Sequence, residues 1–155
     1  MKISVIIPVY KNKEIFLKNF NYNYDFIKNF EIIVVDDASS EDIENQIQIK
    51  FEKVKVLFNK KNIGFAGSVN RGLGESRGEL TLLLNSDVKL ETVDFENLIS
   101  QFKKDRELFA ISFLQKEEGG KKFGKNVIFF ERGLIYHKKA SNLQKGLTAW
   151  AEGGS

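Results

Sequence analysis

Five short, mostly apolar runs alternate with amphipathic stretches along the first 113 residues, and this alternation restricts the fold more than any other feature of the sequence. The runs cover residues 3–10, 31–37, 54–58, 80–84 and 109–113. Runs of this length and character are typical of strands buried on both faces of a parallel sheet. Since the stretches between them have helical spacing, we predict an α/β fold with a doubly wound, largely parallel sheet and helices on both of its faces.

Apolar side chains recur between the runs at three- and four-residue steps, which is the spacing of one helix face. The stripes are Phe16, Phe20, Tyr24 and Ile27, then Ile43, Ile47 and Phe51, and last Phe95, Leu98, Ile99 and Phe102. Ser39 and Asp42 stand in the spacing of a capping box before the second stripe. Residues 64–72 are mostly small, which predicts a helix that packs closely on the sheet.

The character of the sequence changes near Gln115, where lysines and glycines surround short apolar pieces. Two of these pieces, 127–130 and 133–136, predict a hairpin or flap laid over one end of the sheet. We therefore assign residues 1–114 to an α/β core and residues 115–155 to the flap and the start of a further region. A length of 155 residues suits a single domain that contains both parts.

Composition excludes several classes of protein. The absence of cysteine excludes disulfides, thiolate metal sites and cysteine nucleophiles. A net charge of +3 is too small to indicate nucleic-acid binding. No apolar run approaches the ~20 residues of a membrane span, and Met1 leaves no room for a signal peptide before the first strand. These features predict a cytoplasmic protein whose lysine pairs form a solvated surface, with a weak contact to an anionic membrane as the open alternative.

Polar side chains follow two of the predicted strands. Asp36 and Asp37 end the second strand, and Asn85, Ser86 and Asp87 follow an unbroken run of leucines. The carboxyl ends of parallel strands meet at one edge of the sheet, where open α/β sheets bind their ligands. Clustered carboxylates repel one another unless a cation or a hydrogen-bonding ligand compensates them.

A divalent cation together with a nucleotide diphosphate would compensate these carboxylates. Asp87 is a suitable oxygen ligand for Mg²⁺ or Mn²⁺, which would bridge it to phosphate oxygens. Asp36 or Asp37 would accept hydrogen bonds from the base or the ribose. The alternative is that these residues only turn the chain or cap the following helices, because all of them are good turn and cap residues.

Two common nucleotide motifs are excluded by their context. Gly64 and Gly67 allow a close backbone approach, and Lys60, Lys61 and Arg71 are near enough in sequence to attract phosphate. A dinucleotide fingerprint, however, follows the first strand, where Pro-Val-Tyr stands instead, and the P-loop sequence is absent. Close packing of a helix on the sheet also explains these glycines. The lone His137 lies in a lysine-rich segment and is interpreted as a surface residue.

Four blocks of the sequence resemble glycosyltransferase family 2. They are SVIIPVY at 4–10, VVDDAS at 34–39, NIGFAG at 62–67 with the nearby Asn70, and LLNSD at 83–87. They occur in the family's order and at its spacing within roughly the first ninety residues. The third block resembles most closely the branch that includes rhamnosyltransferase-type enzymes of polysaccharide assembly.

The resemblance implies the GT-A fold, with residues 1–114 binding a nucleotide-sugar and residues 115–155 beginning the acceptor side. It implies transfer of a sugar to an acceptor hydroxyl with inversion at the anomeric carbon. The implied donor-binding residues are Pro8, Val9 and Tyr10 at the nucleotide, Asp36 or Asp37 at the base or ribose, Gly67 and Asn70 along the donor, and Asn85 and Ser86 beside the metal ligand Asp87.

The sequence departs from the family pattern at three points. Lys11 stands where the family often has asparagine, and Asn85 replaces the first carboxylate of the Asp-x-Asp element. The general base that an inverting transfer requires is expected beyond Ser155, since Glu152 comes too early in the chain. The chain as given is therefore expected to hold the donor site without the catalytic base.

We therefore expect the donor-binding part of a metal-dependent, inverting glycosyltransferase. Its expected partners are a nucleotide-diphosphate sugar and a glycan or lipid-linked acceptor, with no nucleic acid, in the cytoplasm or at the inner face of the membrane. One alternative is a non-catalytic module that binds nucleotide-sugars. A more distant alternative is a receiver domain of signalling proteins, but that fold carries its acidic pair after the first strand, whereas here the pair follows the second.

Overall fold

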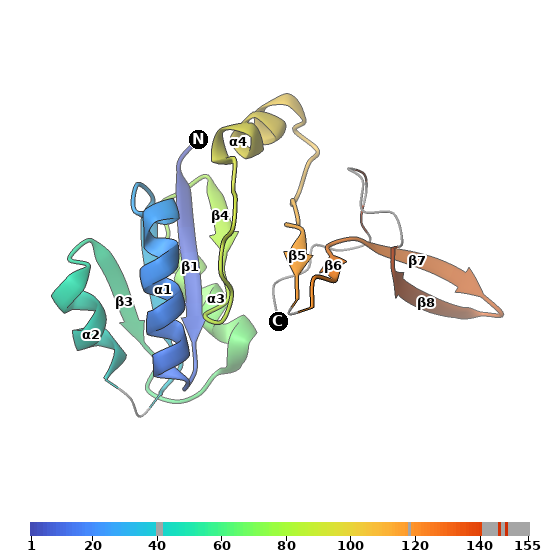
Figure 1. The fold of residues 1–155 in the computed structure, drawn as a ribbon. Coiled ribbons are helices and arrows are strands. Elements are labelled where there is room, and N and C mark those ends of the chain that lie inside the picture. The colour runs from blue at the N-terminus through green and yellow to red at the C-terminus, as the bar shows by residue number, and fades with distance from the viewer. Residues whose placement is uncertain (40–41, 118, 141–145, 147, 149–155) are drawn as a thin grey trace. The chain divides into compact units, whose positions relative to one another are not determined.

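The computed structural model describes residues 1–39, 42–117, 119–140, 146 and 148. The chain divides into two compact units, Met1–Val93 and Asp94–Ser155. The first unit contains β1 (Ile3–Val9), α1 (Lys13–Ile27), β2 (Glu31–Asp36), α2 (Ile43–Lys50), β3 (Val54–Phe58), α3 (Gly64–Glu75) and β4 (Leu80–Leu83) (Figure 1). The second contains α4 (Phe95–Lys104), β5 (Gln115–Lys116), β6 (Lys122–Phe123), β7 (Asn126–Glu131) and β8 (Leu134–Lys139).

The first unit is built on a four-stranded sheet in the order β3-β2-β1-β4, and every neighbouring pair is parallel. The chain moves outward from β1 to β3 and then returns to the other side of β1. Right-handed crossovers in these two directions place α3 on the face opposite to α1 and α2 (Figure 1). The doubly wound parallel sheet predicted from the sequence is confirmed in this unit.

The core of the first unit lies on both faces of β1 and β2, which are buried along nearly their whole length. Ile6, Ile33 and Val35 form one face with Leu57, and α3 packs closely on that face because Gly72 has no side chain. A β-carbon at Gly72 would lie 2.7 Å from the side chain of Ile6. The predicted close packing of a small-residue helix on the sheet is therefore confirmed.

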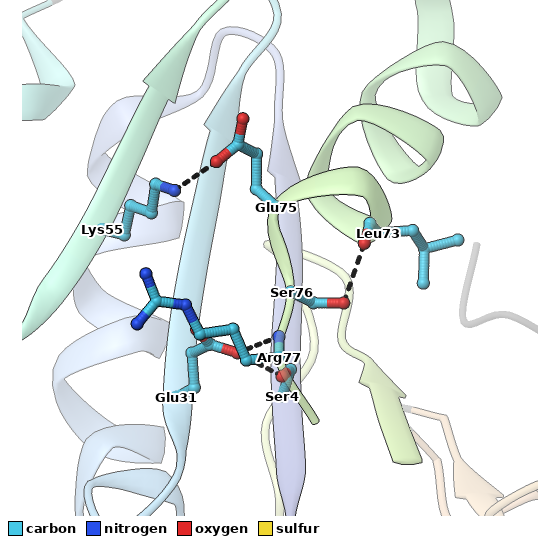
Figure 2. A network of polar contacts seen from close by, with 7 residues as sticks. All are labelled: Ser4, Glu31, Lys55, Leu73, Glu75, Ser76 and Arg77. Carbon is cyan, nitrogen blue, oxygen red and sulfur yellow. Dashed lines mark hydrogen bonds and ion pairs between the residues drawn. The ribbon is translucent and has the colours of Figure 1, made fainter. Parts of the chain in front are cut away.

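The turn from α3 into β4 is fixed at the amino ends of β1 and β2 (Figure 2). The Ser4 hydroxyl donates to the Glu31 carboxylate and accepts a hydrogen bond of 2.8 Å from Gly78 N. Arg77 N donates to the same carboxylate oxygen at 2.7 Å. The bond from Ser4, with a smaller contribution from Arg77, lowers the pKa of Glu31 below its ordinary value. This network ties the start of β4 to the two central strands.

The predicted strand at 109–113 is wrong. These residues have no regular secondary structure, and the Phe109 side chain is 96% exposed. A strand forms only where a neighbouring strand supplies hydrogen-bond partners, and none pairs with this run among the described residues. The apolar run led to the prediction of a strand, but no neighbouring strand is present among the described residues to pair with it.

The predicted capping box before α2 is also wrong, because neither of its two residues has the predicted role. Asp42 is the N-cap, and its carboxylate accepts a hydrogen bond of 3.3 Å from Asn45 N. Ser39 instead accepts a bond of 2.9 Å from Lys11 N, in the loop after β1. Ser39 thus joins two loops at the carboxyl edge of the sheet rather than starting a helix.

The second unit contains the predicted hairpin, which is confirmed as β7 and β8 in antiparallel register. Its turn is Arg132-Gly133, and both residues have positive φ, at 52° and 80°. Two such residues form the turn that matches the twist of a tight hairpin. The position of the hairpin over the sheet and the functional boundary at residue 114 stay predictions. Within the described ranges, no helix is long and apolar enough to cross a membrane.

Candidate functional site

A cleft of about 300 Å³ opens at the carboxyl ends of β1, β2 and β4 in the first unit. Its wall comes from these strand ends and from the start of α3: Pro8, Val9, Tyr10, Asp37, Asn62, Gly64, Phe65, Ser68, Asn85, Ser86 and Asp87. β1 is the strand at which the chain reverses its direction across the sheet. The cleft therefore lies where open α/β sheets bind their ligands, and most of the residues predicted for the donor site form its wall.

Asp37 lies in the cleft wall and holds the start of α3. Its Oδ1 accepts hydrogen bonds from Ile63 N at 2.9 Å and Asn59 Nδ2 at 2.8 Å, and its Oδ2 accepts one from Gly64 N at 2.9 Å. Burial alone would raise the pKa of Asp37, but these hydrogen bonds favour the carboxylate and hold the pKa below its ordinary value. Asp37 thus caps α3, a helix that begins 27 residues later, and not the helix that follows it directly.

Asp36 lies outside the cleft wall. Its carboxylate accepts a hydrogen bond of 2.9 Å from Ser39 N and is only 3% exposed. It therefore shapes the loop after β2, and the structure brings Asp37 rather than Asp36 to the cleft. Lys11 and Ala38, in the two loops that meet here, both have φ near 60°, a conformation that costs about 1 kcal/mol or more for residues other than glycine.

Asn59 was missed by the sequence analysis. It is buried at the end of β3, and its Nδ2 donates both to Asp37 Oδ1 and, at 3.0 Å, to Ser68 Oγ. Arg71 donates to Asn59 Oδ1 and to the carbonyl of Phe58. Arg71 therefore supports Asp37 through Asn59, which differs from the phosphate contact that its charge suggested. Its place directly after the predicted strand 54–58, like that of the polar residues after two other strands, was the signal that could have identified Asn59.

The segment after β4, which comprises residues 84–90, presents oxygen atoms to the cleft. The ladder extends one residue beyond the strand, where Leu84 N donates to Ile6 O at 3.0 Å, and Val88 N then closes a turn on Asn85 O at 3.2 Å. Asp87 is exposed in the cleft wall. Asn85 Oδ1 is buried and has no hydrogen-bond partner in the described part of the chain. Leaving such an atom unpaired costs about 1–3 kcal/mol, so Asn85 Oδ1 is suited to meet a ligand.

These oxygen atoms fit a hard divalent cation only in part. Asp87 supplies one carboxylate and Asn85 one amide oxygen, which are ligands that Mg²⁺ and Mn²⁺ accept. Across the described ranges, no group of three or more His, Cys, Asp or Glu side chains could hold a metal ion. Mg²⁺ commonly binds through one or two carboxylates together with substrate phosphates. The residues present therefore fit a cation that a bound diphosphate helps to hold.

Gly67 and Asn70 are not brought to the cleft wall. Gly67 packs beside Ile63 at the start of α3, where an added β-carbon would lie 3.0 Å from that side chain. Asn70 is exposed further along the helix. Their contact with a donor stays a prediction.

Two asparagines of α1 were also missed. Asn19 and Asn23 are buried, and both donate to backbone carbonyls of the segment after β4. They fall on the same helix face as Phe16, Phe20 and Ile27, at positions where the apolar stripe is interrupted. Polar residues inside an otherwise apolar stripe were the signal that could have identified them.

We expect the stability of the first unit to depend on ionised Asp37. Because the folded-state pKa lies below the ordinary value of about 3.9, the stabilisation is present above that pH and is lost as the pH falls through the folded-state pKa. Asp37→Asn should lower the free energy of unfolding at pH 7 by about 2 kcal/mol or more, since an amide cannot accept all of these hydrogen bonds. It should also reduce the difference in stability between pH 7 and pH 3. Urea unfolding at both values measures this, and an unchanged pH dependence would contradict the assignment.

Both the sequence and the fold of the chain are similar to those of known proteins. The family model described as glycosyl transferase family 2 matches residues 4–153. An uncharacterized glycosyltransferase of Rickettsia bellii is 38% identical over an alignment of 91 residues, and the match covers 56% of this chain and 13% of that protein. The chain thus spans only a small part of the length of this relative.

Two solved structures are similar to this one. TarS 1–349 of S. aureus, in complex with UDP-GlcNAc, gives a TM-score of 0.58 at 27% identity and covers 67% of this chain and 32% of that one. A mannosyltransferase of Pyrobaculum calidifontis, in complex with GDP-Man and Mn²⁺, gives a TM-score of 0.61 at 19% identity. This match covers 75% of this chain and 36% of that one. The GT-A type of α/β fold predicted from the sequence is confirmed by these likenesses.

Proposed function

Since the chain belongs to glycosyl transferase family 2, we propose that its first unit binds a nucleotide-diphosphate sugar in the cleft and serves as the donor-binding part of an inverting glycosyltransferase. One observation carries this proposal. Tyr10, Asp37 and Asp87 belong to three separate parts of the sequence but line one cleft. The cleft lies at β1, where the chain reverses the direction in which it crosses the sheet.

The nucleoside would occupy the side of the cleft next to β1 and α3. Tyr10 is 46% exposed there and offers an aromatic face, with Pro8 and Val9 beside it. Asp37 is an ionised acceptor for N–H or hydroxyl groups of the base or ribose. The Lys11 Nζ lies 5.0 Å from the centre of the Tyr10 ring, so a cation stands beside the place proposed for the nucleoside.

The diphosphate would lie at the segment after β4. Asp87 and Asn85 would hold Mg²⁺ or Mn²⁺, and Ser86 offers a hydroxyl beside them. When bound, the cation stabilises the negative charge of the leaving diphosphate. The catalytic base is proposed to be an acidic residue outside residues 1–155. Transfer to a glycan or lipid-linked hydroxyl, a cytoplasmic location and a contact with the membrane stay predictions.

Calorimetric titration tests the proposal. The chain is titrated with UDP-, GDP- and dTDP-sugars, each with Mn²⁺, with Mg²⁺ and with EDTA. We expect saturable binding of one nucleotide class that requires the cation. If no nucleotide binds under any of these conditions, the donor-site assignment is wrong.

A second assay separates an enzyme from a non-catalytic binding module. The donor that binds is incubated with the natural protein and a glycan acceptor, and the released nucleoside diphosphate is measured. Release that depends on the acceptor supports the transferase, whereas binding without release favours the module.

A further inference from the structure

Asn23 of α1 clamps the backbone of the segment after β4. Its side chain is only 2% exposed, and both ends of its amide are used. Nδ2 donates to Val88 O at 2.8 Å, and Oδ1 accepts from Leu90 N at 2.9 Å. One buried side chain therefore fixes two backbone groups of a segment that has no regular secondary structure of its own.

Further contacts join the same segment to α1. Asn19, one helical turn before Asn23, donates its Nδ2 to Ser86 O at 3.4 Å. Lys89 Nζ lies 5.6 Å from the centre of the Tyr22 ring, and the Leu90 side chain is 7% exposed. The backbone is thus held on both sides of Asp87, before it at Ser86 and after it at Val88.

α1 is itself fixed in position by the packing of its apolar side chains. Phe16, Phe20 and Ile27 are almost completely buried, and Phe20 meets the ring of Phe51 edge-on at 5.0 Å. The sheet itself guides the segment only as far as Leu84, whose N–H makes the last ladder-type hydrogen bond to Ile6. From there to Leu90, the path of the backbone is set largely by the asparagines of α1.

Asp87 needs such support because its own side chain has none. It is exposed, and within the described residues its carboxylate makes no hydrogen bond or ion pair. The position of the carboxylate therefore depends on the backbone that carries it. Groups that orient a metal ligand from outside the coordination sphere typically change metal affinity 10–100-fold when they are removed.

We propose that Asn23 is a positioning residue, which sets the place of Asp87 in the cleft by holding the backbone on its C-terminal side, with Asn19 as a second, longer contact on its N-terminal side. This inference rests on the proposed role of Asp87 as a metal ligand. It assigns to α1, which supplies no residue to the cleft wall, a part in metal-dependent donor binding.

The test compares two variants of Asn23. Asn23→Asp keeps the acceptor for Leu90 N and loses the donor to Val88 O, whereas Asn23→Leu removes both. Binding of UDP, GDP and dTDP with Mn²⁺ is measured by calorimetry, and binding of uridine, guanosine and thymidine without metal is measured by NMR. We expect metal-dependent affinity to fall about tenfold or more in Asn23→Asp. Nucleoside binding should stay the same, because the carboxylate of Asp37 is held by Asn59, Ile63 and Gly64 and not by residues 84–90.

A stability-matched control separates positioning from general loosening. Phe20→Leu weakens the packing of α1 but touches none of the hydrogen bonds to residues 86–90. If Asn23→Asp binds metal and nucleotide like the wild-type chain, the inference is overturned. It is also overturned if Phe20→Leu, at equal loss of stability, reduces metal-dependent affinity as much as Asn23→Asp does.

Amide hydrogen exchange tests the clamp without any ligand. Leu90 N–H should be protected in the wild-type chain and in Asn23→Asp, and should exchange at least tenfold faster in Asn23→Leu, while amides of β1 keep their protection. Equal protection of Leu90 in all three overturns the clamp. If the wild-type chain shows no metal-dependent binding, the proposed function fails, and the exchange experiment still decides whether Asn23 holds the segment.

Discussion

Gly78→Ala is expected to destabilise the first unit by about 2–3 kcal/mol. A β-carbon at this position would lie 2.5 Å from Ser4 N and 2.9 Å from Ile3 C. These are backbone atoms of the central strand β1, so they cannot rotate away as the end of a side chain could. Relief requires a shift of the turn between α3 and β4, and overpacking of this kind typically costs 1–3 kcal/mol.

The shift would also break the hydrogen bonds of that turn. Gly78 N would move away from Ser4 Oγ, which it now meets at 2.8 Å. Arg77 N would move away from the Glu31 carboxylate, which it now meets at 2.7 Å (Figure 2). A lost hydrogen bond to a charged group typically costs about 1.5–3 kcal/mol. We therefore expect a lower urea midpoint at pH 7 with an unchanged slope, since the surface exposed on unfolding stays the same.

Gly74→Ala is the matched control. It makes the same chemical change four residues earlier, near the end of α3, where nothing lies within 4 Å of an added β-carbon. Alanine is favoured over glycine in helices by up to about 1 kcal/mol, so this variant should be as stable as the wild-type chain or slightly more stable. Equal midpoints for the two variants would contradict the argument from close approach at Gly78.

The two central strands of the first unit were predictable because they are buried on both faces. In β1 and β2 almost every side chain meets the core, so the apolar run in the sequence coincides with the strand. The run at 109–113 is also mostly apolar but has no strand beside it among the described residues. Whether an apolar run becomes a strand depends on partners elsewhere in the chain, and composition alone does not contain that information.

The cleft was predictable for a similar reason. Polar residues directly after buried strands must lie at the carboxyl edge, so the sequence indicated that Asp36 or Asp37 would lie near Asp87. The resemblance to the family added Tyr10 to this prediction. Their detailed contacts depend on segments far apart in sequence. Asp37 caps α3 from a distance of 27 residues, and Asn23 holds Leu90 across 67. No spacing rule for local motifs covers bonds of that length, and the supporting asparagines were therefore missed.

Asp87→Asn is expected to lower metal-dependent affinity for the nucleotide diphosphate about 100-fold, which corresponds to about 2.7 kcal/mol. Asp87 supplies the sole carboxylate of residues 84–90, and Asn85 beside it in the cleft wall offers only a neutral oxygen. An amide has nearly the same shape as the carboxylate but lacks its charge, which hard divalent cations prefer in their ligands. The stability of the chain should not change, because the Asp87 side chain is exposed.

Asp25→Asn is the control for the change in net charge. Asp25 is exposed on α1 and pairs with Lys28 at 2.8 Å, away from the cleft wall, and exposed pairs of this kind contribute about 0–1 kcal/mol. Both variants make the chain more positive by one charge, so long-range electrostatic effects on a diphosphate should be similar. A loss of affinity in Asp87→Asn alone therefore reflects the missing ligand. Mn²⁺-dependent binding that persists at wild-type strength in Asp87→Asn would show that the cation is held elsewhere.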